Sequence, residues 1–165
     1  MIRTTLTAGL LALLLAACGG ANETKTDDVA VVTPAPNDPN AAPAPVVTEV
    51  PEGVDLALMA AGGEVYGQYC IVCHQQDGNG VTGVFPPMTD PEWIAGDDER
   101  LISVILNGLE GKIEVSGETY NQAMPAHDFL TDEEVAGVLT YVRNSFGNAA
   151  GEITPEQVAA QRGAE

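Results

Sequence analysis

The five residues Cys70-Ile-Val-Cys73-His74 constrain this chain more than any other feature. Two cysteines separated by two residues occur in disulfides, in thiol-redox sites and in zinc sites. A zinc site needs further cysteine or histidine ligands at suitable spacing, and His127 is the only other histidine. A thioredoxin-like site is expected near a βαβ pattern, which the sequence lacks. The motif therefore favours neither a zinc site nor a thioredoxin-like redox site.

His74, directly after Cys73, favours covalent attachment of a haem. In such a motif the two thiols add to the vinyl groups of the porphyrin, and the two-residue spacing places both sulfurs along one haem edge. The next residue directs its imidazole at the iron. The sequence therefore predicts one covalent haem c at Cys70 and Cys73, with His74 as an axial iron ligand.

The second axial position has four candidates, which are Met59, Met88, Met124 and His127. Met124 lies 50 residues beyond His74 and is followed by a proline. Because a proline disfavours helical backbone in the residue before it, Met124 is expected in a loop that folds over the far side of the haem. Met88 is expected in the pocket wall, Met59 in the core and His127 in a solvent-facing loop. We therefore predict Met124 as the second iron ligand.

The beginning of the chain has the features of an export signal. Residues 1–17 contain one cation, Arg3, and an apolar run of about a dozen residues, too short to span a bilayer as a permanent helix. Leu15-Ala-Ala-Cys18 matches the lipobox of bacterial lipoproteins, in which the signal is cut before a lipidated cysteine. Ordinary cleavage, with Cys18 as an incidental thiol, is the alternative. We expect an exported lipoprotein anchored through Cys18 at the periplasmic face of a membrane, inner or outer.

Residues 18–55 hold this cysteine and a linker rich in Ala, Pro, Thr, Val, Asp and Asn. The linker has no hydrophobic period, so it cannot bury enough apolar surface to offset the entropy lost on ordering. We expect a disordered tether that spans roughly 30–35 Å as a flexible coil. Such a tether would let the following domain move near the membrane.

Residues 56–165 are expected to form one domain, with a core at about 58–147 and a C-terminal extension at 148–165. This domain has 17 acidic residues and 4 lysines or arginines, so its formal charge is near −13. Nucleic acid is therefore not expected as a partner, because phosphate binding needs a basic surface. A haem would add a large apolar body to a core of modest size.

The sequence pattern is mainly helical. A first helix is expected over 57–70, a Gly/Pro-rich loop over 75–96, and a second helix starting at Asp97-Asp-Glu, where negative charge suits a helix start. Residues 112–120 alternate briefly and predict a small hairpin that turns at Ser116-Gly117. A capping box of Thr131 and Glu134 starts a helix over 131–146, stopped by a glycine. A last short helix is expected after Thr154-Pro155.

With these elements in place, the sequence resembles a class I cytochrome c, a family of small all-α monohaem electron carriers. The resemblance covers about residues 58–147 and includes the attachment motif, a late methionine followed by proline, and a closing amphipathic helix. It implies four to five helices around one haem. It also implies that Gly62 and Tyr66 on the first helix pack against Val138 and Tyr141 on the last.

Three short motifs resemble one subgroup of this family, and they begin at Val84, Tyr120 and Tyr141. Members of that subgroup serve as cytochrome subunits or fused domains beside quinoprotein dehydrogenases, copper nitrite reductases and terminal oxidases. The resemblance implies that a backbone carbonyl of the Pro86–Pro87 stretch accepts a hydrogen bond from the iron-binding histidine. Pro87 is accordingly expected in the haem pocket.

The same resemblance suggests three further pocket residues. Trp93 would donate its indole N–H to a haem propionate. Tyr120 would line the pocket, and Asn121 would orient the sulfur of Met124.

We therefore expect a membrane-tethered electron carrier, and not an enzyme, that passes single electrons between redox proteins such as a dehydrogenase, a reductase or an oxidase. A peroxidase-like enzyme or a ligand sensor is the alternative from another class, and it would need a labile sixth ligand. A fixed cytochrome subunit of a dehydrogenase or oxidase complex is a third reading that the sequence does not separate from a diffusing shuttle.

Overall fold

A computed structural model describes residues 50–163 of the chain. The predicted export signal, Cys18 and residues 19–49 of the predicted tether lie outside this range. The elements are α1 (Leu56–Val65), the π-helical segment η1 (Tyr66–Cys70), α2 (Ile71–His74), α3 (Pro91–Ile94), α4 (Asp98–Asn107), β1 (Ile113–Val115), β2 (Glu118–Tyr120), α5 (Asp132–Arg143) and α6 (Pro155–Arg162). The predicted all-α class is confirmed, since the described strands form only one two-stranded sheet.

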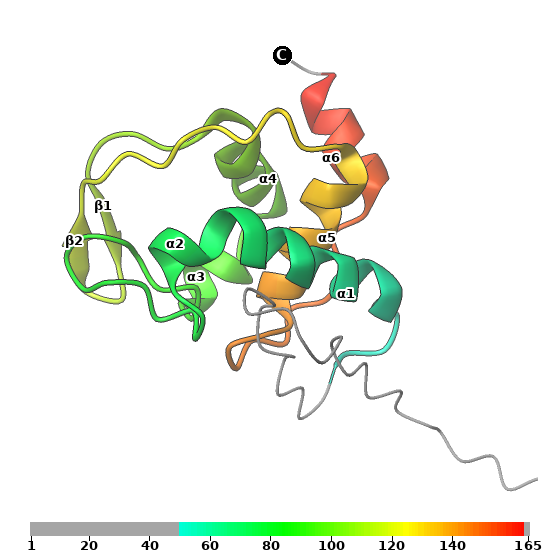
Figure 1. Cartoon of the computed structure of the whole chain (residues 1–165), viewed down its shortest axis with the longest axis horizontal. Coiled ribbons are helices and arrows are strands. Elements are labelled where there is room, and N and C mark those ends of the chain that lie inside the picture. Colours follow the sequence, from blue (N-terminus) through cyan, green and yellow to red (C-terminus); the bar gives the residue numbers. More distant parts are fainter. Residues whose placement is uncertain (1–49, 164–165) are drawn as a thin grey trace, which may run out of the picture. The chain divides into compact units, whose positions relative to one another are not determined.

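The first helix begins at Asp55, whose carboxylate accepts hydrogen bonds from the N–H groups of Ala57 and Leu58. It continues through η1 and α2 to the attachment motif. The stretch Leu56–His74 is long and apolar enough to cross a membrane by length and composition alone. Here it is a core helix of the domain, because α1 packs along α5 (Figure 1).

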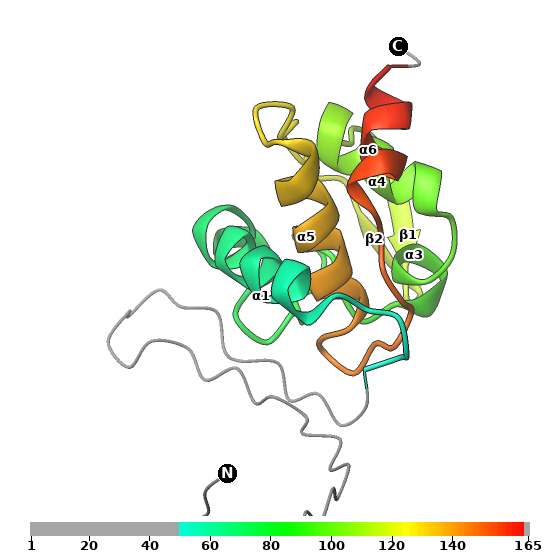
Figure 2. The same ribbon diagram turned by 90° about the vertical axis from the view of Figure 1, so that its right-hand side faces the viewer.

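Two glycines allow α1 and α5 to cross closely. A Cβ atom added to Gly62 would collide with the backbone carbonyl of Gly137, so no larger residue fits there. One turn further along the chain, at the start of η1, the ring of Tyr66 packs on the ring of Tyr141, with a centroid distance of 5.4 Å. The predicted contact between these two helices is therefore confirmed. Figure 2 shows α5 between α1 on one side and α4 and α6 on the other.

The closing helix α5 ends earlier than the sequence pattern predicts. The capping box of Thr131 and Glu134 is present as predicted. The helix stops at Arg143, three residues before the predicted end, because the side chain of Asn144 donates hydrogen bonds to the carbonyls of Thr140 and Gly151. Gly151 lies outside the helix, and a local pattern could not indicate its role.

The predicted loop over 75–96 contains the short helix α3, which was not predicted although Asp90-Pro91 has the N-cap and N1 pattern of a helix start. Asp90 starts α3 by accepting hydrogen bonds from the N–H groups of Glu92 and Trp93. The same carboxylate accepts two more hydrogen bonds from the N–H and hydroxyl of Ser116, at the turn between β1 and β2. The predicted hairpin therefore exists, and Asp90 joins it to α3.

The C-terminal extension is part of the core. Its residues Ile153 and Val158 are fully buried. The hydroxyl of Thr140 on α5 donates to the carbonyl of Ile153 and accepts from its N–H. A capping box of Thr154 and Gln157 starts α6 as predicted. The extension therefore completes the hydrophobic core next to α4 and α5.

Candidate haem site

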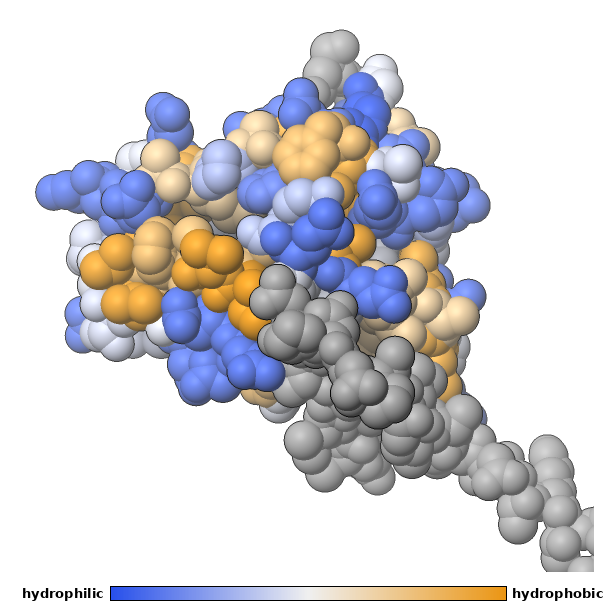
Figure 3. Space-filling model, in the orientation of Figure 1, coloured by the Kyte–Doolittle hydropathy of each residue, from blue (hydrophilic) through white to orange (hydrophobic). Residues whose placement is uncertain are grey.

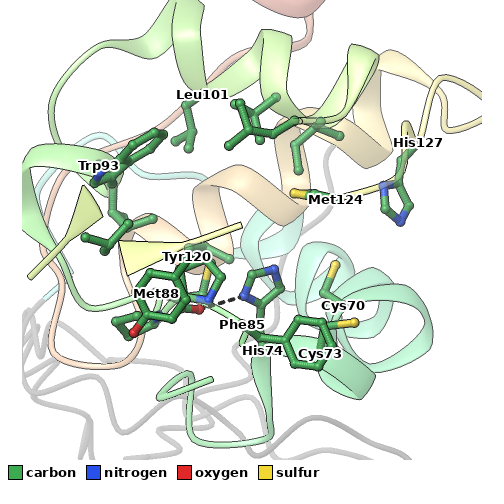
Figure 4. Close-up of a pocket in the computed structure, with 18 of the residues that line it drawn as sticks. Cys70, Cys73, His74, Phe85, Met88, Trp93, Leu101, Tyr120, Met124 and His127 are labelled. Atoms are coloured by element: carbon green, nitrogen blue, oxygen red, sulfur yellow. Dashed lines mark hydrogen bonds between the residues drawn. The ribbon is translucent and has the colours of Figure 1, made fainter. Parts of the chain in front are cut away.

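A large apolar pocket lies between the attachment motif, α3, α4, the hairpin and α5. It encloses about 1210 Å³ of empty space, counted out to the solvent at its mouth. Both cysteines of the motif, His74 and Met124 line it. Figure 4 shows the imidazole of His74 and the sulfur of Met124 directed into the same cavity. The pocket therefore brings together all four predicted attachment and ligand residues.

Cys70 and Cys73 are free thiols at one wall of this pocket. Cys70 is the last residue of η1, and Cys73 lies on α2, which follows directly. Burial raises the pKa of the Cys70 thiol to about 12, and the neighbouring Cys73 contributes to the rise.

His74 is held in one orientation by the loop that follows it. Its side chain is buried, and its Nδ1 lies 3.0 Å from the carbonyl oxygen of Pro86, which accepts the N–H. The structure thus shows the hydrogen bond that the resemblance implied, with Nε2 left to face a metal. Burial lowers the pKa of His74, the bond to Pro86 opposes this, and His127 lowers the pKa further. The neutral imidazole, which binds metals, is therefore favoured.

Met124 is positioned by an isolated bridge between two loop segments. Its N–H donates to the carbonyl of Leu109 at 2.9 Å, and its carbonyl accepts from the N–H of Leu109 at 3.0 Å. Gly108 permits this approach, because it has a φ of +75° and an added Cβ would lie 2.5 Å from the carbonyl oxygen of Met124. The sulfur is therefore fixed at the pocket by backbone pairing.

Trp93 lines the wall formed by α3 and the hairpin. Its indole N–H is donated to the carbonyl of Glu114, at 2.9 Å. The predicted hydrogen bond from Trp93 to a propionate is thus replaced by a bond within the protein, since β1 lies directly beside α3. Tyr120 lines the pocket as predicted and is buried, and Pro87 is also in the wall.

Asn121 does not belong to the pocket. It is exposed, while its neighbour Tyr120 points inward. Tyr120 and Gln122 line the pocket on either side of Asn121, which is absent from the lining. The prediction that Asn121 orients the sulfur of Met124 has no support in the structure.

Two residues that the sequence pattern did not place in the pocket do line it. The guanidinium of Arg100 lies over the ring of Trp93, 4.6 Å from its centroid, and donates to the carbonyl of Glu92. Its Nε is buried without a hydrogen-bond partner in the described part of the chain. His127, predicted to face solvent, is half-buried at the pocket next to Met124 (Figure 4). Neither side chain carries a local sequence signal.

These groups fit a covalently attached haem. Two thiols lie at one wall, an imidazole has its Nδ1 occupied and its Nε2 available, and a thioether lies in the same cavity. The unpartnered N–H of Arg100 is a suitable donor to an anionic substituent, because a buried donor without a partner costs free energy. Zinc is not favoured, because no group of three or more metal-ligating His, Cys, Asp or Glu residues occurs among residues 50–163.

Comparisons with known proteins also support a covalently attached haem. Residues 59–146 match the family model described as cytochrome c. A cytochrome c-552 of Thermus thermophilus is 40% identical over 130 residues, which cover 65% of this chain and 87% of that protein. The cytochrome c subunit of a quinone alcohol dehydrogenase from Gluconobacter oxydans is 37% identical over 93 residues, covering 54% of this chain and 19% of the subunit. The cytochrome c subunit of gluconate 2-dehydrogenase from Pantoea cypripedii is 35% identical over 107 residues, covering 61% and 24% respectively.

Proposed function

This chain belongs to the cytochrome c family, and on that basis we propose that it is a membrane-tethered carrier of single electrons between redox proteins. Its cofactor is one covalently bound haem c. One observation carries the proposal: His74 and Met124 face the same cavity, so that the chain itself can fill both axial positions of the iron. A site closed in this way favours electron transfer over catalysis on a bound substrate.

The roles of the residues follow from their positions. Cys70 and Cys73 would hold the cofactor through thioether bonds, and Pro86 keeps the imidazole of His74 in the orientation that presents Nε2. When bound, the haem supplies an iron that alternates between Fe(III) and Fe(II). Ligation by histidine and methionine favours a higher reduction potential than ligation by two imidazoles.

The surface beside the attachment motif is where electrons would enter and leave. Val72 on α2 is 75% exposed, and Val81 and Val84 in the following loop are about 40% exposed. Figure 3 shows apolar atoms gathered over the part of the molecule where α2 lies in Figure 1, with hydrophilic residues around them. Such a surface permits close approach of a partner to the haem edge.

A dehydrogenase is the favoured kind of redox partner, because several similar proteins are cytochrome subunits of dehydrogenases. The formal charge of −13 in residues 56–165 favours a partner with a basic docking surface. Stopped-flow electron transfer to a basic redox protein should slow as ionic strength rises, because salt screens the attraction. A rate that increased with salt would contradict the charge argument.

We further propose export and lipid anchoring at the periplasmic face of a membrane, supported by the lipobox that ends at Cys18. Membrane fractions and incorporation of labelled fatty acid test this. The wild-type chain should be labelled and sediment with membranes, while Cys18→Ser should abolish the label. A variant that keeps both properties would exclude the anchor.

The redox proposal is tested by optical spectroscopy and carbon monoxide binding. The reduced-minus-oxidised spectrum should contain a sharp c-type α-band, and the oxidised protein should show the far-red band of iron–thioether ligation. The reduced protein should resist carbon monoxide at neutral pH. Rapid binding of carbon monoxide without the far-red band would instead favour a haem enzyme or a sensor.

A further inference from the structure

His127 lines the pocket and has an iron-binding side chain, yet the proposed function does not use it. It lies three residues after Met124 and lines the same pocket. The sequence contains no histidine other than His74 and His127. The imidazole of His127 is therefore the second nitrogen ligand available to an iron in this cavity.

One nitrogen of the His127 ring lacks a hydrogen bond in the described part of the chain. Its Nδ1 is buried and has no hydrogen-bond partner within residues 50–163. The ring packs against two aromatic rings, Phe129 at a centroid distance of 5.7 Å and Tyr69 at 6.5 Å. A buried nitrogen without a partner costs free energy, which coordination of a metal would recover.

The imidazoles of His74 and His127 both line this pocket. Figure 4 shows the two imidazoles at the same cavity, with the sulfur of Met124 between them in this view.

We propose that His127 is a reserve distal ligand, which binds the haem iron opposite His74 whenever the thioether of Met124 is lost. This inference rests on the proposed ligation by His74 and Met124.

Backbone pairing explains why Met124 is the resting ligand. The two hydrogen bonds between Met124 and Leu109 fix the sulfur at the pocket, and the N–H of His127 donates to the carbonyl of Ile105 at 2.8 Å. The loop around His127 would have to shift against these bonds for its imidazole to reach the iron. The loop is also held from α6, because Arg162 donates to the carbonyls of Asp128 and Leu130, so the shift has to work against these bonds as well.

With such a reserve ligand, all coordination positions of the iron would stay filled after damage to Met124. A methionine that is oxidised or replaced no longer offers a thioether sulfur. With His127 in its place the iron would keep six ligands and a lower reduction potential, because two imidazoles stabilise Fe(III) relative to histidine and methionine. An open coordination position, which peroxidase-like chemistry needs, would not appear.

The test compares the spin state of the oxidised haem-loaded protein in wild type and three variants. Met124→Leu keeps the size of the side chain and removes the sulfur, so the far-red band should disappear while the haem stays low-spin. Met124→Leu with His127→Gln should become high-spin or water-ligated. Met124→Leu with Asp128→Asn is the matched control in the same loop, because Asp128 is exposed, and it should stay low-spin.

Added imidazole provides a second readout that does not depend on activity. If His127 occupies the iron for nine-tenths of the time or more, the double variant without His127 should bind external imidazole at least about tenfold more tightly than Met124→Leu. Recovery of a low-spin spectrum on saturation would show that the pocket of the double variant is folded.

One outcome would contradict the reserve ligand alone, and a different outcome would contradict the proposed axial pair. A Met124→Leu protein that is already high-spin, with the same imidazole affinity as the double variant, excludes the reserve ligand and leaves the proposed function intact. Retention of the far-red band in Met124→Leu would mean that a different thioether binds the iron, and it would contradict the proposed axial pair itself.

Discussion

Arg100 is the only lysine or arginine that lines the pocket in the described part of the chain. It stacks on Trp93 and makes neither of the two described ion pairs, which involve Arg143 and Arg162. A fixed positive charge near a haem stabilises the reduced state, because reduction adds negative charge. Arg100 should therefore raise the reduction potential.

We expect Arg100→Gln to lower the reduction potential. An interaction on the order of 1 kcal/mol at an effective dielectric constant near 20 corresponds to roughly 40 mV for a one-electron couple. Spectroelectrochemical titration measures the shift. Lys112→Gln removes an exposed cation outside the pocket and should change the potential much less. Equal shifts in both variants would contradict a specific role for Arg100.

Asp90 is a second residue whose importance depends on its neighbours. The hydroxyl of Ser116 has the largest effect on its pKa and lowers it, burial opposes this, and hydrogen bonds from backbone N–H groups lower it further. The folded-state pKa therefore lies below the unfolded value of about 3.9. The stability that this carboxylate contributes is present above about pH 4 and is lost as the pH falls through the folded-state pKa.

Asp90→Asn should accordingly destabilise the protein near neutral pH, and the difference from wild type should shrink in acid. Guanidinium unfolding at a series of pH values measures this. The amide of asparagine presents N–H donors to Ser116, which itself donates two hydrogen bonds to Asp90. Asp97→Asn serves as the control, because Asp97 caps α4 through a single N–H and should matter less. A difference that is constant with pH would contradict the linkage.

The crossing of α1 and α5 is the contact on which the arrangement of the helices depends. Gly62 leaves no room for a side chain against the backbone of Gly137. Gly63, the next residue on α1, faces the ring of Tyr141, where an added Cβ would lie 3.1 Å from the nearest ring atom. The two positions therefore differ in what a methyl group would meet, backbone in one case and a movable ring in the other.

Gly62→Ala should lower the free energy of unfolding by about 3 kcal/mol, at the upper end of overpacking effects, because the two helices must separate. Gly63→Ala should cost far less, since a small ring movement is offset by the better helix propensity of alanine, worth roughly 1 kcal/mol. Denaturant titration of the haem-loaded proteins compares them. Similar losses in both variants would mean that the close crossing is not what limits stability.

Elements whose signals are local could be predicted from the sequence. The capping box of Thr131 and Glu134 and the turn at Ser116-Gly117 each involve residues a few positions apart. The end of α5 could not, because Asn144 binds the carbonyl of Gly151 beyond the helix. Asp90-Pro91 is a local signal for the start of α3, whereas the bond of Asp90 to Ser116, 26 residues away, has none.

The C-terminal extension lies largely beyond the matched family region, and yet it completes the core. Arg143 on α5 is buried, and it donates to the carbonyls of Ile94 and Ala150 while it pairs with Asp98 at 2.6 Å. Removal of the extension would leave this cation without two of its acceptors, the carbonyls of Ala150 and Gly151. A buried charge that loses its partners is costly.

Ile153→Ala should destabilise the haem-loaded protein by about 2–5 kcal/mol, because Ile153 is fully buried and its loss leaves a cavity. Ala160→Ser on the exposed face of α6 is the matched control and should stay within about 0.5 kcal/mol of wild type. Thermal unfolding followed by circular dichroism compares the two. A wild-type melting temperature in Ile153→Ala would show that the extension folds independently of the core.

The sequence by itself determined the covalent chemistry of this protein, because thioether attachment and the first iron ligand need only five neighbouring residues, Cys70 to His74. The tertiary structure decided what surrounds that motif. Arg100 and His127 reach one pocket that distant segments of the chain enclose, Asp90 binds Ser116, and Asn121 lies outside the pocket lining. Such contacts exist only after the helices have packed, and a local pattern therefore cannot specify them.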